Sequence, residues 1–162
     1  MIAALSLLAG GVWWQVLHRP TASTTSSCGQ QNQNVKAVGP ALPSAKSVSV
    51  RVYNATNRTG LARAVASQLR KRGFGIMRTG NDPLGNDRQV EGVGELRYGQ
   101  AGIGPATLVS LQFPGIQLAE DSRTSRSVDI AIGPDFRRLA TTAEISKARK
   151  QLGARLRNSN VC

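Results

Sequence analysis

The sequence predicts a two-layer α/β sandwich, in which a small mixed sheet carries two helices on one face as a βαβ unit followed by β-α-β-β. Three observations support this fold class. Apolar residues alternate with polar ones over 48–53, an amphipathic stripe follows over 61–69, and the alternation returns over 128–132. A period of two is typical of a half-buried strand, and a period near 3.6 of an amphipathic helix. A chain of 162 residues suits one folded domain, expected over 47–139.

The βαβ unit is expected over residues 47–79. A turn over 54–60 leads into a helix with Thr59 as its N-cap, and Gly73 ends that helix. A second strand over 74–78 should then lie parallel to the first, with a right-handed crossover. The apolar side of the first strand consists of Val48, Val50 and Val52.

The second half of the domain has weaker sequence signals. Residues 80–94 include Asn81-Asp82-Pro83 and four glycines, which indicates a long loop, and long loops in compact domains are often functional. A helix with Pro105 in its first turn follows, and Asp129 is placed on the face of the last strand opposite its apolar residues. The expected elements are strands over 95–98, 116–119 and 128–132 and a helix over 105–113.

Both ends of the chain differ from this domain. Residues 1–19 begin with an uncharged apolar run in which Trp13 and Trp14 suit a membrane interface. We expect an N-terminal transmembrane helix there, with a cleaved signal peptide as the alternative. Residues 20–46 are rich in Ser, Thr, Gln, Asn and Pro and predict a flexible linker. Residues 140–162 predict a C-terminal basic helix and tail.

The side of the membrane on which the domain lies is argued from charges and cysteines. Lys and Arg residues follow the apolar run, beginning with Arg19, and taken alone this favours a cytoplasmic domain. We expect an extracytoplasmic domain, with a basic leader encoded before Met1. Cys28 and Cys162 bracket the domain and are expected to form a disulfide in an oxidising compartment, two unrelated thiols being the alternative.

The charge distribution narrows the choice of partners. The formal net charge is +12, and no Asp or Glu precedes Asp82. Residues 137–157 carry seven Lys or Arg against Glu144 alone, which fits a solvated helix or contact with an anionic surface. Such a chain suits nucleic acid, anionic lipid headgroups or phosphate-bearing wall polymers. Because an exported domain seldom meets nucleic acid, we expect no nucleic-acid partner.

The residues that most catalysis needs are scarce. His18 is the single histidine, so the domain has no histidine for a catalytic triad, a metal site or acid–base chemistry. Two distant cysteines do not form a zinc site, and no P-loop or dinucleotide fingerprint occurs. Two carboxylate pairs, Glu91 with Glu95 and Glu120 with Asp121, are interpreted as surface or turn residues. We therefore expect no catalytic residue, no metal and no cofactor.

Two segments are candidates for ligand binding. The turn over 54–60 leads into a helix N-terminus, where backbone N–H groups can receive an anion, although a purely structural turn is the favoured interpretation. The second candidate is the loop that runs from Asp82 to Tyr98. The candidate ligand-binding residues are Asn54, Thr56, Asn57, Arg58, Thr59, Gly60, Arg63, Asn81, Asp82, Glu95, Arg97 and Tyr98.

Several stretches together resemble the LytR C-terminal domain, which accompanies, or stands apart from, the LytR-CpsA-Psr ligases that attach glycopolymers to bacterial peptidoglycan. The resemblance covers about residues 48–139, with its segments in the right order. Each segment is loose by itself, and their combination is specific. The segments are VRVYNATNRTGLARAVASQLRKRGF (50–74), TGNDP (79–83), GVGELRYGQAG (92–102), FPG (113–115) and VDIAIGPDFRRL (128–139).

The resemblance implies an accessory envelope role without catalysis. The anchor, linker and short C-terminal extension are similar to the stand-alone actinobacterial form, as in mycobacterial envelope-integrity and vesiculogenesis-regulating proteins, and the ligase catalytic domain has no counterpart. We expect a membrane-anchored, extracytoplasmic scaffold or polymer-binding module. Its expected partners are LytR-CpsA-Psr-type ligases, peptidoglycan or another anionic wall polymer, and the membrane, with self-association also considered. An enzyme acting on wall glycans and a basic nucleic-acid-binding domain are the rival interpretations.

Overall fold

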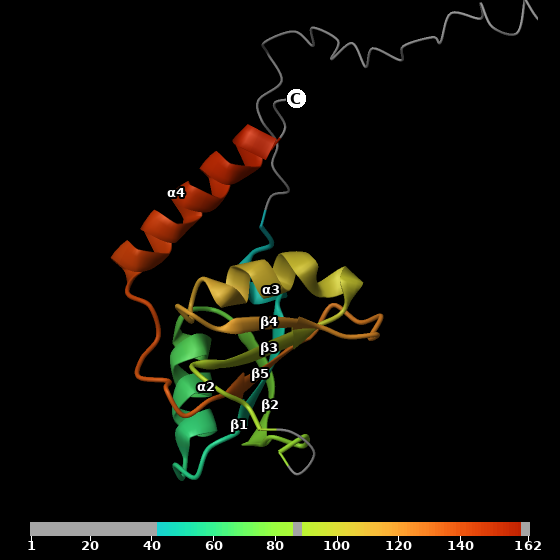
Figure 1. The fold of residues 1–162 in the computed structure, drawn as a ribbon, viewed down its shortest axis with the longest axis vertical. Helices are drawn as coiled ribbons and strands as arrows, with labels where there is room; N and C mark the ends of the chain where they lie inside the picture. The colour runs from blue at the N-terminus through green and yellow to red at the C-terminus, as the bar shows by residue number, and fades with distance from the viewer. Residues whose placement is uncertain (1–41, 86–88, 160–162) are drawn as a thin grey trace, which may run out of the picture. The chain divides into compact units, whose positions relative to one another are not determined.

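A five-stranded mixed sheet lies at the centre of the fold (Figure 1). The computed structural model describes residues 42–85 and 89–159, all of which belong to one unit, Val35–Cys162. A short 3-10 helix, η1 (Ala45–Ser47), precedes the first strand, and a second one, η2 (Gln100–Gly102), precedes a later helix. Neither short helix is expected from the sequence.

The strands lie in the order β2-β1-β5-β3-β4. The central parallel trio is β1 (Ser49–Asn54), with β2 (Gly75–Asn81) on one side and β5 (Val128–Ile132) on the other. By contrast, β3 (Gly94–Tyr98) runs antiparallel to β5 and parallel to β4 (Gln117–Glu120). The carboxyl ends of β1, β2 and β5 therefore meet at one edge of the sheet. The expected mixed sheet and parallel βαβ unit are confirmed.

The helix α2 (Leu61–Lys71) connects β1 to β2. It begins after Gly60, whose φ of 78° lies in the left-handed region that favours glycine. The prediction that Thr59 caps this helix is wrong, because the N-cap is Gly60 and no side chain caps the helix there. The buried stripe of the helix consists of Ala62, Val65, Ala66 and Leu69.

The end of α2 follows the sequence prediction. Gly73 has a φ of 89° and donates its N–H to the carbonyl of Arg70 at 2.9 Å. The N–H of Phe74 reaches the carbonyl of Leu69 at 3.1 Å, which completes a Schellman motif. A glycine is needed where the chain leaves the helix, and Gly73 as the stop is confirmed.

The helix α3 (Ile103–Ser110) connects β3 to β4 and is apolar almost all round. The segment that precedes β1 contacts α3, because a Cβ built on Gly104 would lie 3.6 Å from Pro43 Cδ. Leu42 also packs against the core. The linker expected over 20–46 therefore overlaps at its end with packed chain.

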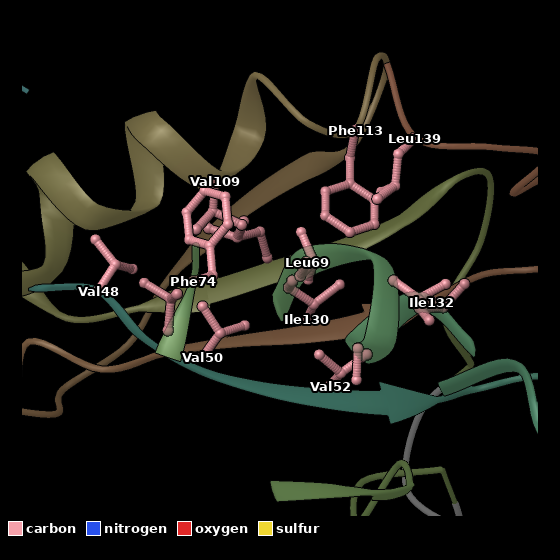
Figure 2. Close-up of a cluster of buried hydrophobic side chains, with 14 of the residues drawn as sticks. Val48, Val50, Val52, Leu69, Phe74, Val109, Phe113, Ile130, Ile132 and Leu139 are labelled. Atoms are coloured by element: carbon pink, nitrogen blue, oxygen red, sulfur yellow. The ribbon is translucent and has the colours of Figure 1, made fainter. Parts of the chain in front are cut away.

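One hydrophobic core joins both helices to a single face of the sheet (Figure 2). The strand residues of this core alternate along their strands, which places β1, β5 and β3 side chains on the same face. Phe113 and Phe136 add a tilted aromatic pair with ring centroids 5.8 Å apart. Among the residues that the structure describes, this core cluster extends from Leu42 to Leu139. The fully buried members include Val50, Val52, Leu69, Leu96, Leu108, Phe113, Ile130 and Ile132.

The helix α4 (Thr142–Ser159) begins with a capping box. Thr141 donates its N–H to Glu144 Oε2 at 2.7 Å, and the N–H of Glu144 points back to Thr141 Oγ1 at 3.3 Å. Arg138 holds the same carboxylate through Nη1 and Nη2, at 2.8 and 2.9 Å. The hydrogen bond from Arg138, followed by those from Thr141, lowers the pKa of Glu144 far below its usual range.

Some of the expectations fall on residues 1–41 and 160–162, outside those that the structure describes. These are the transmembrane anchor over 1–19 and the disulfide between Cys28 and Cys162. Within residues 42–85 and 89–159, no helix combines the length and apolarity that crossing a membrane requires.

Replacing Val50 or Leu69 with Asp is expected to destabilise the domain by about 3 kcal/mol or more, because each places a charge without a partner among fully buried side chains. Thermal melting followed by circular dichroism measures the change. Arg63→Ala is the control, because Arg63 is exposed on the same helix and its loss should change stability by less than about 0.5 kcal/mol. Equal melting temperatures for the three variants would contradict the assigned faces.

Candidate functional site

A polar hollow lies where β1 and β2 end and α2 begins, with a volume of about 210 Å³. A second hollow adjoins it and is lined also by Thr56, Asn57 and Asp82. The carboxyl ends of parallel strands are the usual place for ligands in open α/β sheets. We call the first cavity the strand-end hollow; its lining residues are Asn54, Thr59, Gly60, Ala62, Arg63, Thr79, Gly80 and Asn81.

Asn54 organises the turn that forms one wall of this hollow. Its buried Nδ2 donates to the carbonyl of Arg58 at 2.8 Å. Its Oδ1 accepts the N–H of Thr56 at 3.1 Å and the Thr56 hydroxyl at 2.8 Å. Thr56 Oγ1 in turn accepts the N–H of Arg58 at 3.1 Å. The polar groups of Asn54 are therefore engaged in holding the turn, as the structural interpretation of this segment expects.

Arg58 also has a structural partner. Its Nη1 donates to the carbonyl of Phe136 at 3.0 Å, and its Nη2 to that of Gly133 at 3.4 Å. Both carbonyls belong to the chain just after β5. Arg58 thus ties the turn to the end of the neighbouring strand, and it does not line the strand-end hollow.

Asp82 and Arg97 form a buried ion pair on the sheet face opposite the helices. Arg97 Nη1 and Nη2 donate to Asp82 Oδ1 and Oδ2 at 2.7 and 2.8 Å, and Arg97 Nε donates to Glu95 Oε2 at 3.0 Å. The side chains of Arg97 and Asp82 are 6% and 1% exposed. Asp82 follows β2 directly and Arg97 lies in β3, so the pair spans the two strands between them. The loop after β2 is therefore fastened to the sheet.

A second set of ion pairs lies on the same sheet face. Arg51 Nε donates to Asp129 Oδ1 at 2.6 Å, and Arg123 Nη1 lies 3.0 Å from Asp129 Oδ2. That second contact is an ion pair without hydrogen-bond geometry. Arg123 also binds Asp121 and, mainly through this hydrogen bond, lowers the pKa of Asp121. Asp129 lies on the expected face of its strand, and the loop over 121–127 is held against that face.

The structure brings most of the candidate residues to the two adjoining hollows and leaves four elsewhere. Arg58 supports the turn, while Glu95 and Arg97 are buried in the ion pairs beside Asp82. Tyr98 is the last residue of β3 and packs against the core. Because β3 runs antiparallel to β5, this end of β3 lies at the sheet edge opposite the carboxyl ends of β1, β2 and β5. The candidates that line the hollows are Asn54, Thr56, Asn57, Thr59, Gly60, Arg63, Asn81 and Asp82.

Sequence reasoning missed three residues of the strand-end hollow: Ala62, Thr79 and Gly80. The second strand was expected to end at residue 78, whereas β2 continues to Asn81, paired with Asn54. Thr and Gly beside a loop gave a weak strand signal. Recognising that the TGN stretch extends the strand would have placed Thr79 and Gly80 at the hollow.

The strand-end hollow offers hydroxyl and amide groups and the exposed guanidinium of Arg63. Asp82, a carboxylate that lines the adjoining hollow, has both oxygens bound by Arg97. Among the residues that the structure describes, no three His, Cys, Asp or Glu side chains are placed to hold a metal. This set of groups can bind a hydroxyl-rich or anionic molecule.

Asn54→Ala should destabilise the domain by about 1–3 kcal/mol, because it removes three part-buried hydrogen bonds that hold the turn. Urea unfolding gives the free energy, and hydrogen exchange of the Thr56 and Arg58 amides reports the turn. Asn57→Ala is the matched control, because Asn57 is exposed in the same turn. Unchanged exchange at both amides in Asn54→Ala would refute the role assigned to Asn54.

Arg97→Met should cost about 3–5 kcal/mol of stability, because it removes the guanidinium from two buried carboxylates and leaves their charges without it. Urea unfolding measures this free energy. Arg78→Met, an exposed arginine in β2, is the control and should change stability by less than about 0.5 kcal/mol. If both variants unfold at the same urea concentration, the ion pair does not hold the loop.

Comparison with known proteins assigns the fold to a family. The chain is 32% identical over 127 residues to the cell envelope integrity protein Cei of Mycobacterium tuberculosis. This match covers 78% of the chain and 59% of Cei, so the chain spans about three fifths of the length of this curated relative.

A solved structure gives independent support for the fold. It is the crystal structure of the soluble domain of a conserved hypothetical secreted protein from Mycobacterium marinum, matched with a TM-score of 0.60 and 37% identity. The match covers 63% of this chain and 69% of that one. The family model described as LytR cell envelope-related transcriptional attenuator matches residues 47–136. With more than half of its length matched by that model, the chain belongs to the LytR_C family.

Proposed function

We propose that this chain is a non-catalytic module of the cell envelope that binds a cell-wall polymer at the strand-end hollow. The observation that carries the proposal is the composition of that hollow. Hydroxyls, amides and the exposed Arg63 line it, while the adjacent carboxylate of Asp82 is neutralised by Arg97. Peptidoglycan and anionic wall glycopolymers are rich in hydroxyl groups and negative charge, which are the complements of this lining.

The names of the relatives support a location outside the cytoplasm. One is called a cell envelope integrity protein and the other a conserved hypothetical secreted protein. We place the domain on the extracytoplasmic side, held by the apolar segment near Met1. A tether raises the local concentration of a weak binder at the membrane. In this arrangement the module supports wall assembly and envelope integrity as a scaffold, with LytR-CpsA-Psr-type ligases as a second kind of partner.

An enzyme acting on wall glycans is the rival proposal. Such an enzyme needs two carboxyl groups that converge on the scissile bond, roughly 5–10 Å apart. Glu91 is exposed in its loop, whereas Glu95 is buried and bound to Arg97 at 3.0 Å. The carboxylate of Glu95 is therefore engaged by an arginine within the sheet. These placements favour binding over catalysis.

The test is sedimentation of residues 42–162 with purified peptidoglycan that still carries its wall polymers. Wild-type protein should co-sediment, and the double variant Arg63→Ala/Asn81→Ala should bind about tenfold more weakly, because it removes a charged and an amide hydrogen-bonding group from the hollow. Circular dichroism verifies that both proteins are folded.

The matched control is Gln100→Ala/Arg126→Ala, which removes the same kinds of group from exposed positions distant from the hollow. Its binding should equal that of the wild type. Equal binding by all three proteins would contradict the hollow as the binding site. Release of soluble sugar fragments by the wild type but not by Glu91→Gln would favour the enzyme.

A further inference from the structure

The C-terminal helix α4 carries far more positive charge than the ion pairs of the domain use. Residues 142–159 contain five Lys or Arg and one carboxylate, Glu144. That carboxylate is bound by Arg138 and by Thr141 at the start of the helix. It therefore does not offset the cations farther along, of which Lys147, Arg149 and Lys150 are exposed.

An apolar stripe runs along the same helix. Ile145, Ala148, Leu152 and Leu156 follow one another at intervals of three or four residues, so they share one side. Each of them is half-buried, unlike the fully buried stripe of α2. By the same spacing, Arg149 lies at the border of the stripe, where a long side chain can bury its methylenes and keep its charge in water.

The first two turns of α4 lie beside the body of the domain. Ile145 and Arg149 line a hollow together with Phe74 and Leu108. Leu152 is half-buried and is not among the residues of the hydrophobic core cluster described above. Lys147 and Lys150 are exposed and Leu152 is half-buried, so these three side chains are positioned to contact another surface.

We propose that α4 docks on the surface of a lipid bilayer that contains anionic phospholipid, with its apolar stripe at the headgroup boundary and its cations on the phosphates. Basic amphipathic helices bind such surfaces through buried apolar area together with attraction to anionic lipid. This contact is separate from the strand-end hollow and does not depend on the function proposed for it.

Charge and amphipathicity favour a bilayer over other occupants. A second copy of α4 would bring its own excess of cations, and like charges in contact are destabilising. A soluble polyanion would use the cations and leave the apolar stripe in water. A bilayer with anionic headgroups is complementary to both features at once.

The experiment measures binding of residues 42–162 to vesicles under reducing conditions, without the N-terminal apolar run. This part contains the core cluster of the described residues, and circular dichroism verifies its folding. Wild-type protein should bind vesicles of phosphatidylglycerol and phosphatidylcholine, and should not bind vesicles of phosphatidylcholine alone. Lys147→Gln/Lys150→Gln should weaken binding about 30-fold, since each cation near an anionic surface contributes about a fivefold factor.

Two further variants make the result specific. Arg126→Gln/Arg137→Gln removes the same charge from exposed positions outside α4 and should change binding by less than about threefold. Leu152→Gln keeps every charge and should weaken vesicle binding about tenfold, because it removes an apolar side chain from the bilayer boundary. Loss of vesicle binding in these variants with retained peptidoglycan binding would separate this surface from the strand-end hollow.

Three results would overturn the proposal. The first is equal binding of the α4 and control charge variants to anionic vesicles. The second is that each of the wild type and Leu152→Gln binds soluble polyphosphate as tightly as it binds anionic vesicles. This result would indicate a site for a soluble polyanion. The third is a concentration-dependent dimer that Leu152→Gln abolishes while vesicle binding is absent, which would make a second copy the occupant.

Discussion

The bidentate ion pair between Arg97 and Asp82 is buried on the sheet face opposite α2 and α3. The two helices bury the Val, Ile and Leu side chains of one face, and the other face carries arginines and carboxylates in cross-strand positions. Burying such charges is unfavourable unless each has a partner with good geometry. Asp82 supplies both oxygens to Arg97, and Asp129 serves Arg51 and Arg123. The loops after β2 and before β5 are thereby held on the sheet, and Asp82 and Gly85 of the first loop line the second hollow.

This use of charge bears directly on function. The carboxylates of Asp82 and Glu95 are bound by Arg97, whereas the lining of the strand-end hollow consists mainly of hydroxyl and amide groups and the guanidinium of Arg63. This lining is the basis of the binding function proposed above. The excess of positive charge instead lies on exposed helix positions, above all in α4. The sheet arginines Arg51 and Arg97 are thus bound to carboxylates, whereas Lys147 and Lys150 of α4 are exposed.

The sequence predicted the central strands and the end of α2 better than the strand order and the partners of individual side chains. Alternation at Val50 and Val52 and at Ile130 and Ile132 was strong enough to find the central strands, and Gly73 marked a helix end because its conformation has few substitutes. The strand order, with β5 inserted between β1 and β3, depends on contacts far apart in the chain that periodicity does not encode. The same limit applies to the site: the ion pair of Arg97 with Asp82 crosses two intervening strands, which the sequence pattern does not reveal. Thr59 is not the N-cap, because the helix begins one residue later, after Gly60 in the left-handed conformation.

The two proposed contacts have a physical logic when taken together. A shallow polar hollow and a thin amphipathic helix are each weak binding elements, because neither buries much apolar area. Joined in one folded unit, the two contacts as proposed would act on the wall polymer and the membrane. Once one contact had formed, the second would be an intramolecular event, and its effective concentration would replace the concentration in solution. Weak, separate contacts would also release readily, as the proposed scaffold of a growing wall requires. Affinity then resides in the geometry of the module more than in any single residue.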